Sequence, residues 1–212
     1  MYGQFFILFG LILVGYYCNK KGYLPLETNK NVGHMVMRVT IPAMLITTIA
    51  SIEITDRVLR AFLLSAAGQI AMMVVFGFLM RQYGRKRGLD SRLLPMLDLT
   101  AGSLNTGFIG LPVTMIFFGQ AGIIYMSAGV LALNLYLWSY GVYLISDKKA
   151  TGAAAIGKSF LQGAINPNCI SILLGLLLAV THTARFVPTV VLGFLTKVGD
   201  LSTPLSLIYI GA

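Results

Sequence analysis

The chain has 212 residues, of which 57% are hydrophobic and only 11% are charged. A soluble domain carries about 25% charged residues, so these values and a mean hydropathy of +0.81 predict an integral membrane protein. The formal net charge of +9 does not indicate nucleic-acid binding, because the basic residues lie in short loops between apolar runs.

Seven apolar runs follow one another along the chain. Most of them have about the 20 residues that a helix needs to cross a bilayer, which predicts an all-α membrane protein. The runs are 4–18, 31–52, 58–80, 93–118, 121–146, 166–182 and 187–212.

Basic residues are distributed unequally over the loops between these runs. The loops after odd-numbered runs contain 11 Lys and Arg residues, and the loops after even-numbered runs contain 3. Because cytoplasmic loops are enriched in basic residues, the odd-numbered loops are predicted to face the cytoplasm. The first run is uncharged and is followed by Lys20 and Lys21, which is unlike a cleavable signal peptide and puts the N-terminus outside. We therefore predict that the protein lies in the plasma membrane, which is the inner membrane in a cell that has two membranes.

Two parts of the sequence resemble each other. Residues 6–25 resemble 171–188, and residues 39–46 resemble 201–208. We call these parts the first and second copy. Five runs precede the second copy, so the copies are predicted to have opposite orientations, as in the inverted repeats of secondary transporters. The first and second prolines are Pro25 and Pro42 in the first copy, and Pro188 and Pro204 in the second.

This repeat predicts how the chain is organised. Residues 1–147 would form a first five-helix repeat, 148–163 a cytoplasmic linker, and 164–212 the first two helices of an inverted, truncated second repeat. A complete second repeat needs three further helices, so we expect the chain to be part of a protein with about ten spans.

The fourth run contains a segment that is poorly suited to a helix. Proline removes a backbone donor and glycine weakens the helix, so several backbone groups lose their helical partners. Inside a membrane such groups are tolerated only within protein or beside a watery cavity. The freed N–H groups of the second half-helix suit an anion, which predicts a substrate site; a kink for helix packing is the alternative. The candidate residues are Asn105, Thr106, Gly107, Gly110 and Pro112.

The stretch GSLNTGFIGLPV (102–113) resembles the asparagine-glycine-proline crossover segment of the auxin efflux carrier family, and the short loops are similar to those of its bacterial members. The Thr-Ile-Pro stretch at 40–42 and the Asn-Pro pair at 166–167 also resemble this family's pattern. The resemblance implies ten helices in two inverted five-helix repeats, related to the bile-acid/sodium symporters. It also implies that the unwound fourth helices cross at the site of an organic anion such as auxin or malate, with Asn105 and Pro112 at the crossing. No second crossover segment is present, so the other half of the implied site cannot be named.

Three ionisable residues inside the runs are candidates for ion coupling or charge pairing, because such residues are costly in lipid. Asp98 either binds a proton or cation, or lies at the cytoplasmic interface near Arg92. Arg38 and Asp200 each lie four residues before the second proline of their copy. Arg38 either attracts a carboxylate or extends to lipid headgroups. Asp200 either binds a coupling ion or is neutralised by Lys197.

These features predict a secondary transporter that moves a small organic anion, such as a carboxylate, across the membrane by alternating access. Pro42 and Pro204 are predicted to kink helices beside the site. Because no nucleotide-binding motif is present, an H⁺ or Na⁺ gradient or the membrane potential would supply the energy.

Other functions are less well supported by the residues. The two Cys and two His residues stand apart, without paired acids or a nucleophile beside a base, so neither an enzyme nor a metal or cofactor site is predicted. A sodium-coupled carrier like the bile-acid symporters, or a non-transporting membrane scaffold, are the alternatives. The expected partners are the lipid bilayer and the anion, with a homodimer left open.

Overall fold

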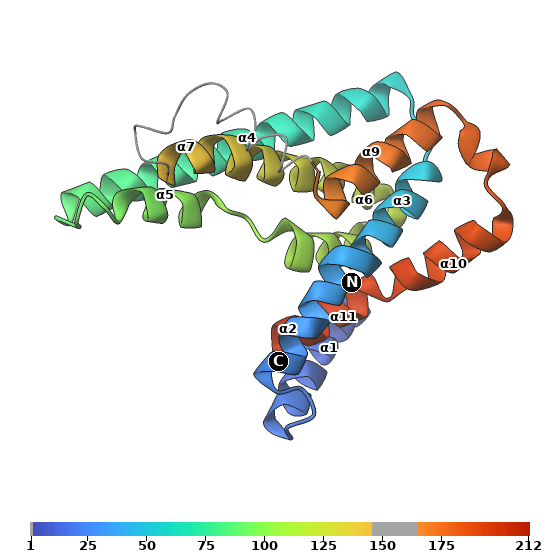
Figure 1. The fold of residues 1–212 in the computed structure, drawn as a ribbon, viewed down its shortest axis with the longest axis horizontal. Coiled ribbons are helices and arrows are strands. Elements are labelled where there is room, and N and C mark those ends of the chain that lie inside the picture. Colours follow the sequence, from blue (N-terminus) through green and yellow to red (C-terminus); the bar gives the residue numbers. More distant parts are fainter. Residues whose placement is uncertain (1, 146–164) are drawn as a thin grey trace.

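The computed structural model of the chain describes residues 2–145 and 165–212. All regular elements in these two ranges are helical, and five helices are long and apolar enough to cross a membrane (Figure 1). The prediction of an all-α membrane protein is therefore confirmed at this level. The predicted linker at 148–163 lies outside the described residues.

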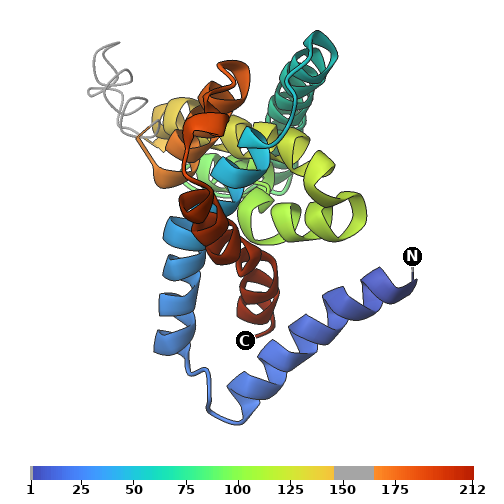
Figure 2. The same ribbon diagram turned by 90° about the vertical axis from the view of Figure 1, so that its right-hand side faces the viewer.

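Two helices from opposite ends of the chain lie side by side. α1 (Tyr2–Lys20) packs on α11 (Ser202–Gly211), and Figure 2 shows α11 between α1 and α2. The axes approach closely at Gly15, where an added Cβ atom would lie only 2.1 Å from the carbonyl oxygen of Ile208. Gly15 is the buried residue of α1, and most of the remaining side chains of this helix are exposed, as in a helix that faces lipid on most sides.

The second span is one long helix with a widened turn in its middle. It consists of α2 (Leu26–Met35), a π-helical turn η1 (Val36–Thr40) and α3 (Ile41–Ala50). It begins earlier than the predicted run at 31, because Pro25 starts a polar first turn that contains Glu27. The ring of Pro42 would clash with the carbonyl four residues earlier, and in η1 the N–H of Ile41 bonds five residues back to Val36 instead.

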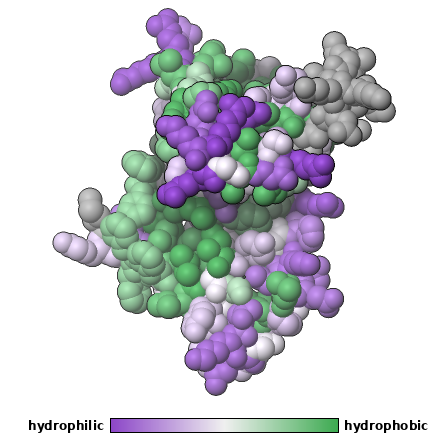
Figure 3. All heavy atoms as spheres, turned by 90° about the vertical axis from the view of Figure 1, so that its left-hand side faces the viewer, coloured by the Kyte–Doolittle hydropathy of each residue, from purple (hydrophilic) through white to green (hydrophobic). Residues whose placement is uncertain are grey.

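The third span is the longest single helix, α4 (Asp56–Lys86). Thr55 caps its N-terminus by accepting a hydrogen bond of 3.3 Å from the backbone N–H of Val58. The turn to α5 (Leu94–Gly102) carries a cluster of basic residues. In Figure 3 hydrophilic side chains gather on the end of the molecule that faces the viewer, where Figure 1 places this turn, and hydrophobic surface lies next to them.

The fourth and fifth runs form a nearly continuous helical stretch with two breaks. After α5 come a non-helical step at 103–105, a second π-helical turn η2 (Thr106–Gly110) and α6 (Leu111–Leu135). A third π-helical stretch η3 (Tyr136–Gly141) and α7 (Val142–Ile145) follow. Gly119 interrupts α6 with φ 63° and ψ −158°, a conformation that side chains other than glycine rarely adopt. This break lies between the predicted runs 93–118 and 121–146.

The sixth and seventh runs form shorter helices. α9 (Pro167–Val180) has 14 residues, fewer than a straight span needs, and a turn η4 (Thr183–Phe186) follows it. α10 (Thr189–Asp200) and α11 are separated at Leu201, shortly before Pro204. α3 is central to the larger hydrophobic core, packing against α6, α9 and α10.

Candidate functional site

Asn105 organises the break in the fourth span. Its side-chain oxygen accepts a hydrogen bond of 3.1 Å from the N–H of Phe108, so it caps the second half-helix. Its backbone oxygen accepts hydrogen bonds from Ile109 (3.3 Å) and Gly110 (3.0 Å). The amide side chain therefore fixes the start of the half-helix that leads to Pro112.

The break leaves hydrogen-bond donors without partners. Within the residues that the structure describes, the backbone N–H groups of Leu104, Asn105 and Gly107 donate no hydrogen bond. The amide nitrogen of the exposed Asn105 side chain is also unpaired in those ranges. These donors lie at the N-terminal end of a half-helix, where the helix dipole favours negative charge.

The predicted glycines allow close packing around the break. A Cβ atom added at Gly107 would lie 3.3 Å from the sulfur of Met37 in η1, and one added at Gly110 would lie 2.1 Å from the terminal carbon of Met126. Thr106 is only 2% exposed, and its buried hydroxyl has no partner in the described part of the chain. Pro112 is buried in the first turn of α6.

Two π-helical turns therefore meet at the break. In η2 the N–H of Leu111 bonds five residues back to Thr106, just as Ile41 bonds to Val36 in η1. In both cases the residue after this N–H donor is a proline, which has no backbone N–H to donate. The contact between Gly107 and Met37 joins these two irregular turns, at the place where the sequence predicts a substrate site.

Asp98 lies in a buried polar cluster rather than at the interface. It is 1% exposed on α5, and its carboxylate accepts hydrogen bonds from the hydroxyls of Tyr140 (3.0 Å) and Tyr136 (3.5 Å). The guanidinium of Arg81 on α4 forms an ion pair with it at 3.5 Å. The ion partner is therefore Arg81 and not Arg92, which is exposed.

The cluster fits only because two glycines make room for it. A Cβ atom added at Gly77 would lie 2.2 Å from the Asp98 carboxylate, and one added at Gly102 would lie 2.3 Å from the Tyr136 hydroxyl. Sequence reasoning did not identify Arg81, Tyr136 and Tyr140 as the partners of Asp98. The four-residue spacing of the two tyrosines, which places both on one helix face, is the signal that was available.

The other two charged candidates are not paired. Arg38 on η1 and Asp200 at the end of α10 are both exposed, and neither forms an ion pair within the described ranges. The alternative in which Lys197 neutralises Asp200 is therefore not observed.

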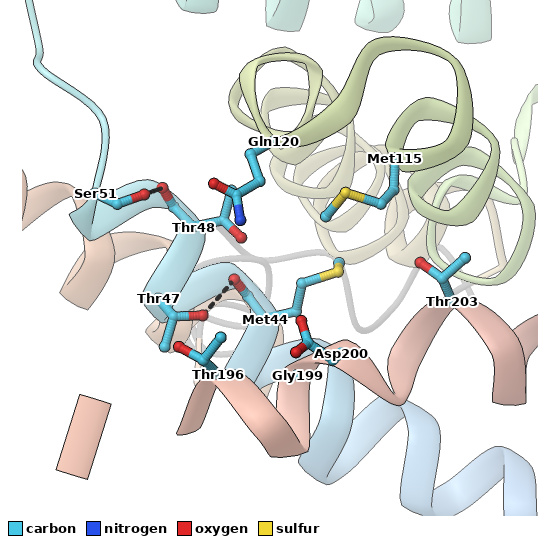
Figure 4. Close-up of a pocket in the computed structure, with 10 residues that line it drawn as sticks. All are labelled: Met44, Thr47, Thr48, Ser51, Met115, Gln120, Thr196, Gly199, Asp200 and Thr203. Carbon is cyan, nitrogen blue, oxygen red and sulfur yellow. Dashed lines mark hydrogen bonds between the residues drawn. The ribbon is translucent and has the colours of Figure 1, made fainter. Parts of the chain in front are cut away.

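Asp200 instead lines a polar cavity of about 280 Å³ between α3, α6, α10 and α11 (Figure 4). The second half-helix of the fourth span reaches this cavity through two residues. They are Met115, which lies three residues after Pro112, and Gln120, which lies next to the break at Gly119. Sequence reasoning did not single out most of its lining. The lining residues are Met44, Thr47, Thr48, Ser51, Met115, Gln120, Thr196, Gly199, Asp200 and Thr203.

The fold and the break together define a class: a helical membrane protein with an interrupted span that leaves backbone groups unpaired between its two half-helices. A family model described as membrane transport protein matches residues 1–212, the whole of the sequence. The chain belongs to this family of transporters, which is the auxin efflux carrier family that its crossover segment resembles.

A relative agrees with this assignment. An uncharacterized transporter from Methanothermobacter thermautotrophicus is 26% identical over 204 residues. The matched region covers 95% of this chain and 64% of the length of the relative. The chain thus spans less than two thirds of that transporter.

Proposed function

We propose that the chain forms part of a secondary carrier that binds a small organic anion at the break in its fourth span and moves it by alternating access. The observation that carries this proposal is the set of unpaired donors around Asn105. They lie near the middle of the segment between Leu94 and Gly119, where lipid would leave them unsatisfied. A carboxylate would accept hydrogen bonds from these groups at the positive end of the half-helix.

Contacts between the two copies support the inverted repeat that this mechanism needs. α1 of the first copy packs on α11 of the second, and α9 of the second copy packs on α3 of the first. A Cβ atom added at Gly211 would lie 2.0 Å from the carbonyl oxygen of Ile12. A Cβ atom added at Gly175 would lie 2.9 Å from the Cβ atom of Ile49.

These two contacts join equivalent positions. Ile12 and Gly175 each lie 13 residues before the first proline of their copy. Gly211 and Ile49 each lie 7 residues after the second proline. The first helix of each copy thus packs on the second helix of the other copy, as a two-fold relation between the copies requires. Two halves related in this way support inward-open and outward-open states of similar energy.

The charges of the chain support an orientation for the carrier. The basic turns after α1 and α4 would face the cytoplasm, with the N-terminus outside, in the plasma membrane. Arg38 is adjacent to Met37, which contacts Gly107, and is the cationic side chain that we assign to attract the substrate carboxylate. Anion movement would be driven by an ion gradient or by the membrane potential.

The test is solute counterflow in vesicles that contain the protein, with carboxylates such as malate as the trial substrates. Asn105→Asp keeps the oxygen that caps the half-helix but removes the amide donor and adds a negative charge. We expect it to insert normally and to lower anion counterflow by at least about 10-fold, which corresponds to about 1.4 kcal/mol. Asn31→Asp on the exposed face of α2 is the matched control and should transport like the parent. Counterflow in Asn105→Asp equal to that of the parent would exclude the break as the anion site.

A further inference from the structure

We infer that the cavity around Asp200 is a binding site for a monovalent hard cation, Na⁺ or a proton. Its role in coupling rests on the carrier function proposed above, whereas binding itself does not. The cavity lies between the second span, the seventh span and the half-helix that follows the break (Figure 4).

The first argument is an uncompensated charge. Asp200 lies near the middle of the candidate span Thr189–Gly211. Its carboxylate forms neither an ion pair nor a hydrogen bond within the residues that the structure describes. A carboxylate at this depth is costly unless a cation or a proton neutralises it. The charged or titratable side chains on the helices around it are Lys197, Arg38, Tyr125 and Tyr209, and none of these lines the cavity.

The second argument is the direction of the hydroxyl hydrogens. Thr47, Ser51 and Thr196 each donate a hydrogen bond to a carbonyl oxygen of their own helix, at 3.0, 2.8 and 2.9 Å. A hydroxyl has one hydrogen and two lone pairs, so these groups have only lone pairs left to offer to the cavity. Lone pairs attract a cation and repel an anion. The other polar side chains of the lining, those of Thr48, Thr203 and Gln120, form no hydrogen bond within the described residues, so their oxygens are also free to face a cation.

The oxygen atoms that line the cavity favour one kind of cation. The lining combines one carboxylate with neutral oxygens from Thr and Ser hydroxyls and from the Gln120 amide. Ca²⁺ and Mg²⁺ sites are usually built with more than one carboxylate or with substrate phosphates, and soft metals prefer Cys and His. Among the described residues, no Cys or His lines the cavity, and Asp200 carries the one formal charge in its lining. One negative charge among neutral oxygens suits Na⁺, and the same carboxylate can instead take up a proton.

The position of the cavity explains how a cation there would be coupled to transport. Asp200 and Thr47 belong to α10 and α3, which touch so closely that a Cβ atom at Gly199 would lie 2.7 Å from the Cα atom of Met44. Gln120 belongs to α6, which follows the break at Asn105. A cation held between these groups is sensitive to any movement of α6 relative to α3 and α10.

The experiment measures cation-dependent thermal stability of the purified protein in detergent, which requires no transport. Melting temperatures are compared in NaCl and in choline chloride at equal ionic strength, and in choline chloride from neutral to mildly acidic pH. A cation at 100 times its dissociation constant should raise the melting temperature of the parent by about 5–10 °C. Asp200→Asn and Thr48→Val should lose this response, because each removes a cavity oxygen with little change of shape. Asp56→Asn, at the exposed start of α4, should keep it.

A response to Na⁺ that Asp200→Asn abolishes identifies a sodium site, and a response to acid alone that it abolishes identifies a proton site. The inference is overturned if the parent responds to neither, or if Asp200→Asn responds as the parent does. Loss of anion counterflow with intact cation binding would count against the proposed function and not against this site.

Discussion

Replacing Asp98 with alanine is expected to lower the free energy of unfolding by about 3 kcal/mol. Removing one partner of a buried ion pair costs about 3–5 kcal/mol, and the lower end applies because the Arg81 side chain is 29% exposed. The substitution also takes the acceptor from the hydroxyls of Tyr136 and Tyr140. At this chain length the melting temperature should fall by about 6–12 °C.

Two variants control this prediction. Asp90→Ala removes an exposed carboxylate in the turn between α4 and α5, and the melting temperature should change little. Asp98→Asn keeps the size of the side chain and should lie between parent and Asp98→Ala. Because Asp98 fixes the first half-helix of the broken span to α4 and η3, Asp98→Ala should also reduce anion counterflow. An unchanged melting temperature in Asp98→Ala would show that the cluster does not hold these helices together.

Replacing Gly15 with valine should separate α1 from α11. A Cβ atom there would lie 2.1 Å from the carbonyl oxygen of Ile208 and 2.9 Å from its carbonyl carbon. These are backbone atoms, so no change of rotamer relieves the clash and the helices must move apart. Overpacking costs about 1–3 kcal/mol and sometimes more, and we expect about 3 kcal/mol here.

Gly10→Val is the matched control for this substitution. Gly10 lies on the same helix, and nothing lies within 4 Å of an added Cβ atom. Both substitutions change helix propensity equally, so the difference between them reports the contact with α11. Similar melting temperatures for the two variants would mean that α1 does not pack on α11 in the membrane.

The helices and the break were predictable because they depend on local sequence. Apolar length sets the position of a span, and the seven runs have counterparts in the helices. The glycines and the proline between Gly107 and Pro112 indicate a disturbed helix, since they weaken a helix wherever they occur, and the non-helical step lies just before them, at 103–105. The widened turns before Pro42 and Pro112 were not predicted in form, because proline shows where a helix is disturbed but not how it rearranges.

The partners of the charged residues were not predictable because they depend on packing between spans. Asp98 lies 17 residues from Arg81 and 38 from Tyr136, and only the folded arrangement brings them together. Neutralisation of Asp200 by Lys197, three residues away, was one of two alternatives, and no ion pair joins them in the described part of the chain. The hydroxyls around Asp200 lie in different spans, so no local pattern marks the cavity.

The most direct test of alternating access is whether a reagent reaches the break from both sides of the membrane. Ser103, exposed beside Asn105, is changed to cysteine in a protein that carries Cys18→Ala and Cys169→Ala, and a membrane-impermeant thiol reagent is applied to right-side-out and inside-out vesicles. Arg87→Cys in the α4–α5 turn and Glu53→Cys in the exposed α3–α4 turn mark the two sides. We predict that Ser103→Cys reacts from both sides, whereas Arg87→Cys reacts only from the cytoplasm and Glu53→Cys only from outside. Labelling of Ser103→Cys from one side only, or from neither, would contradict alternating access at this break.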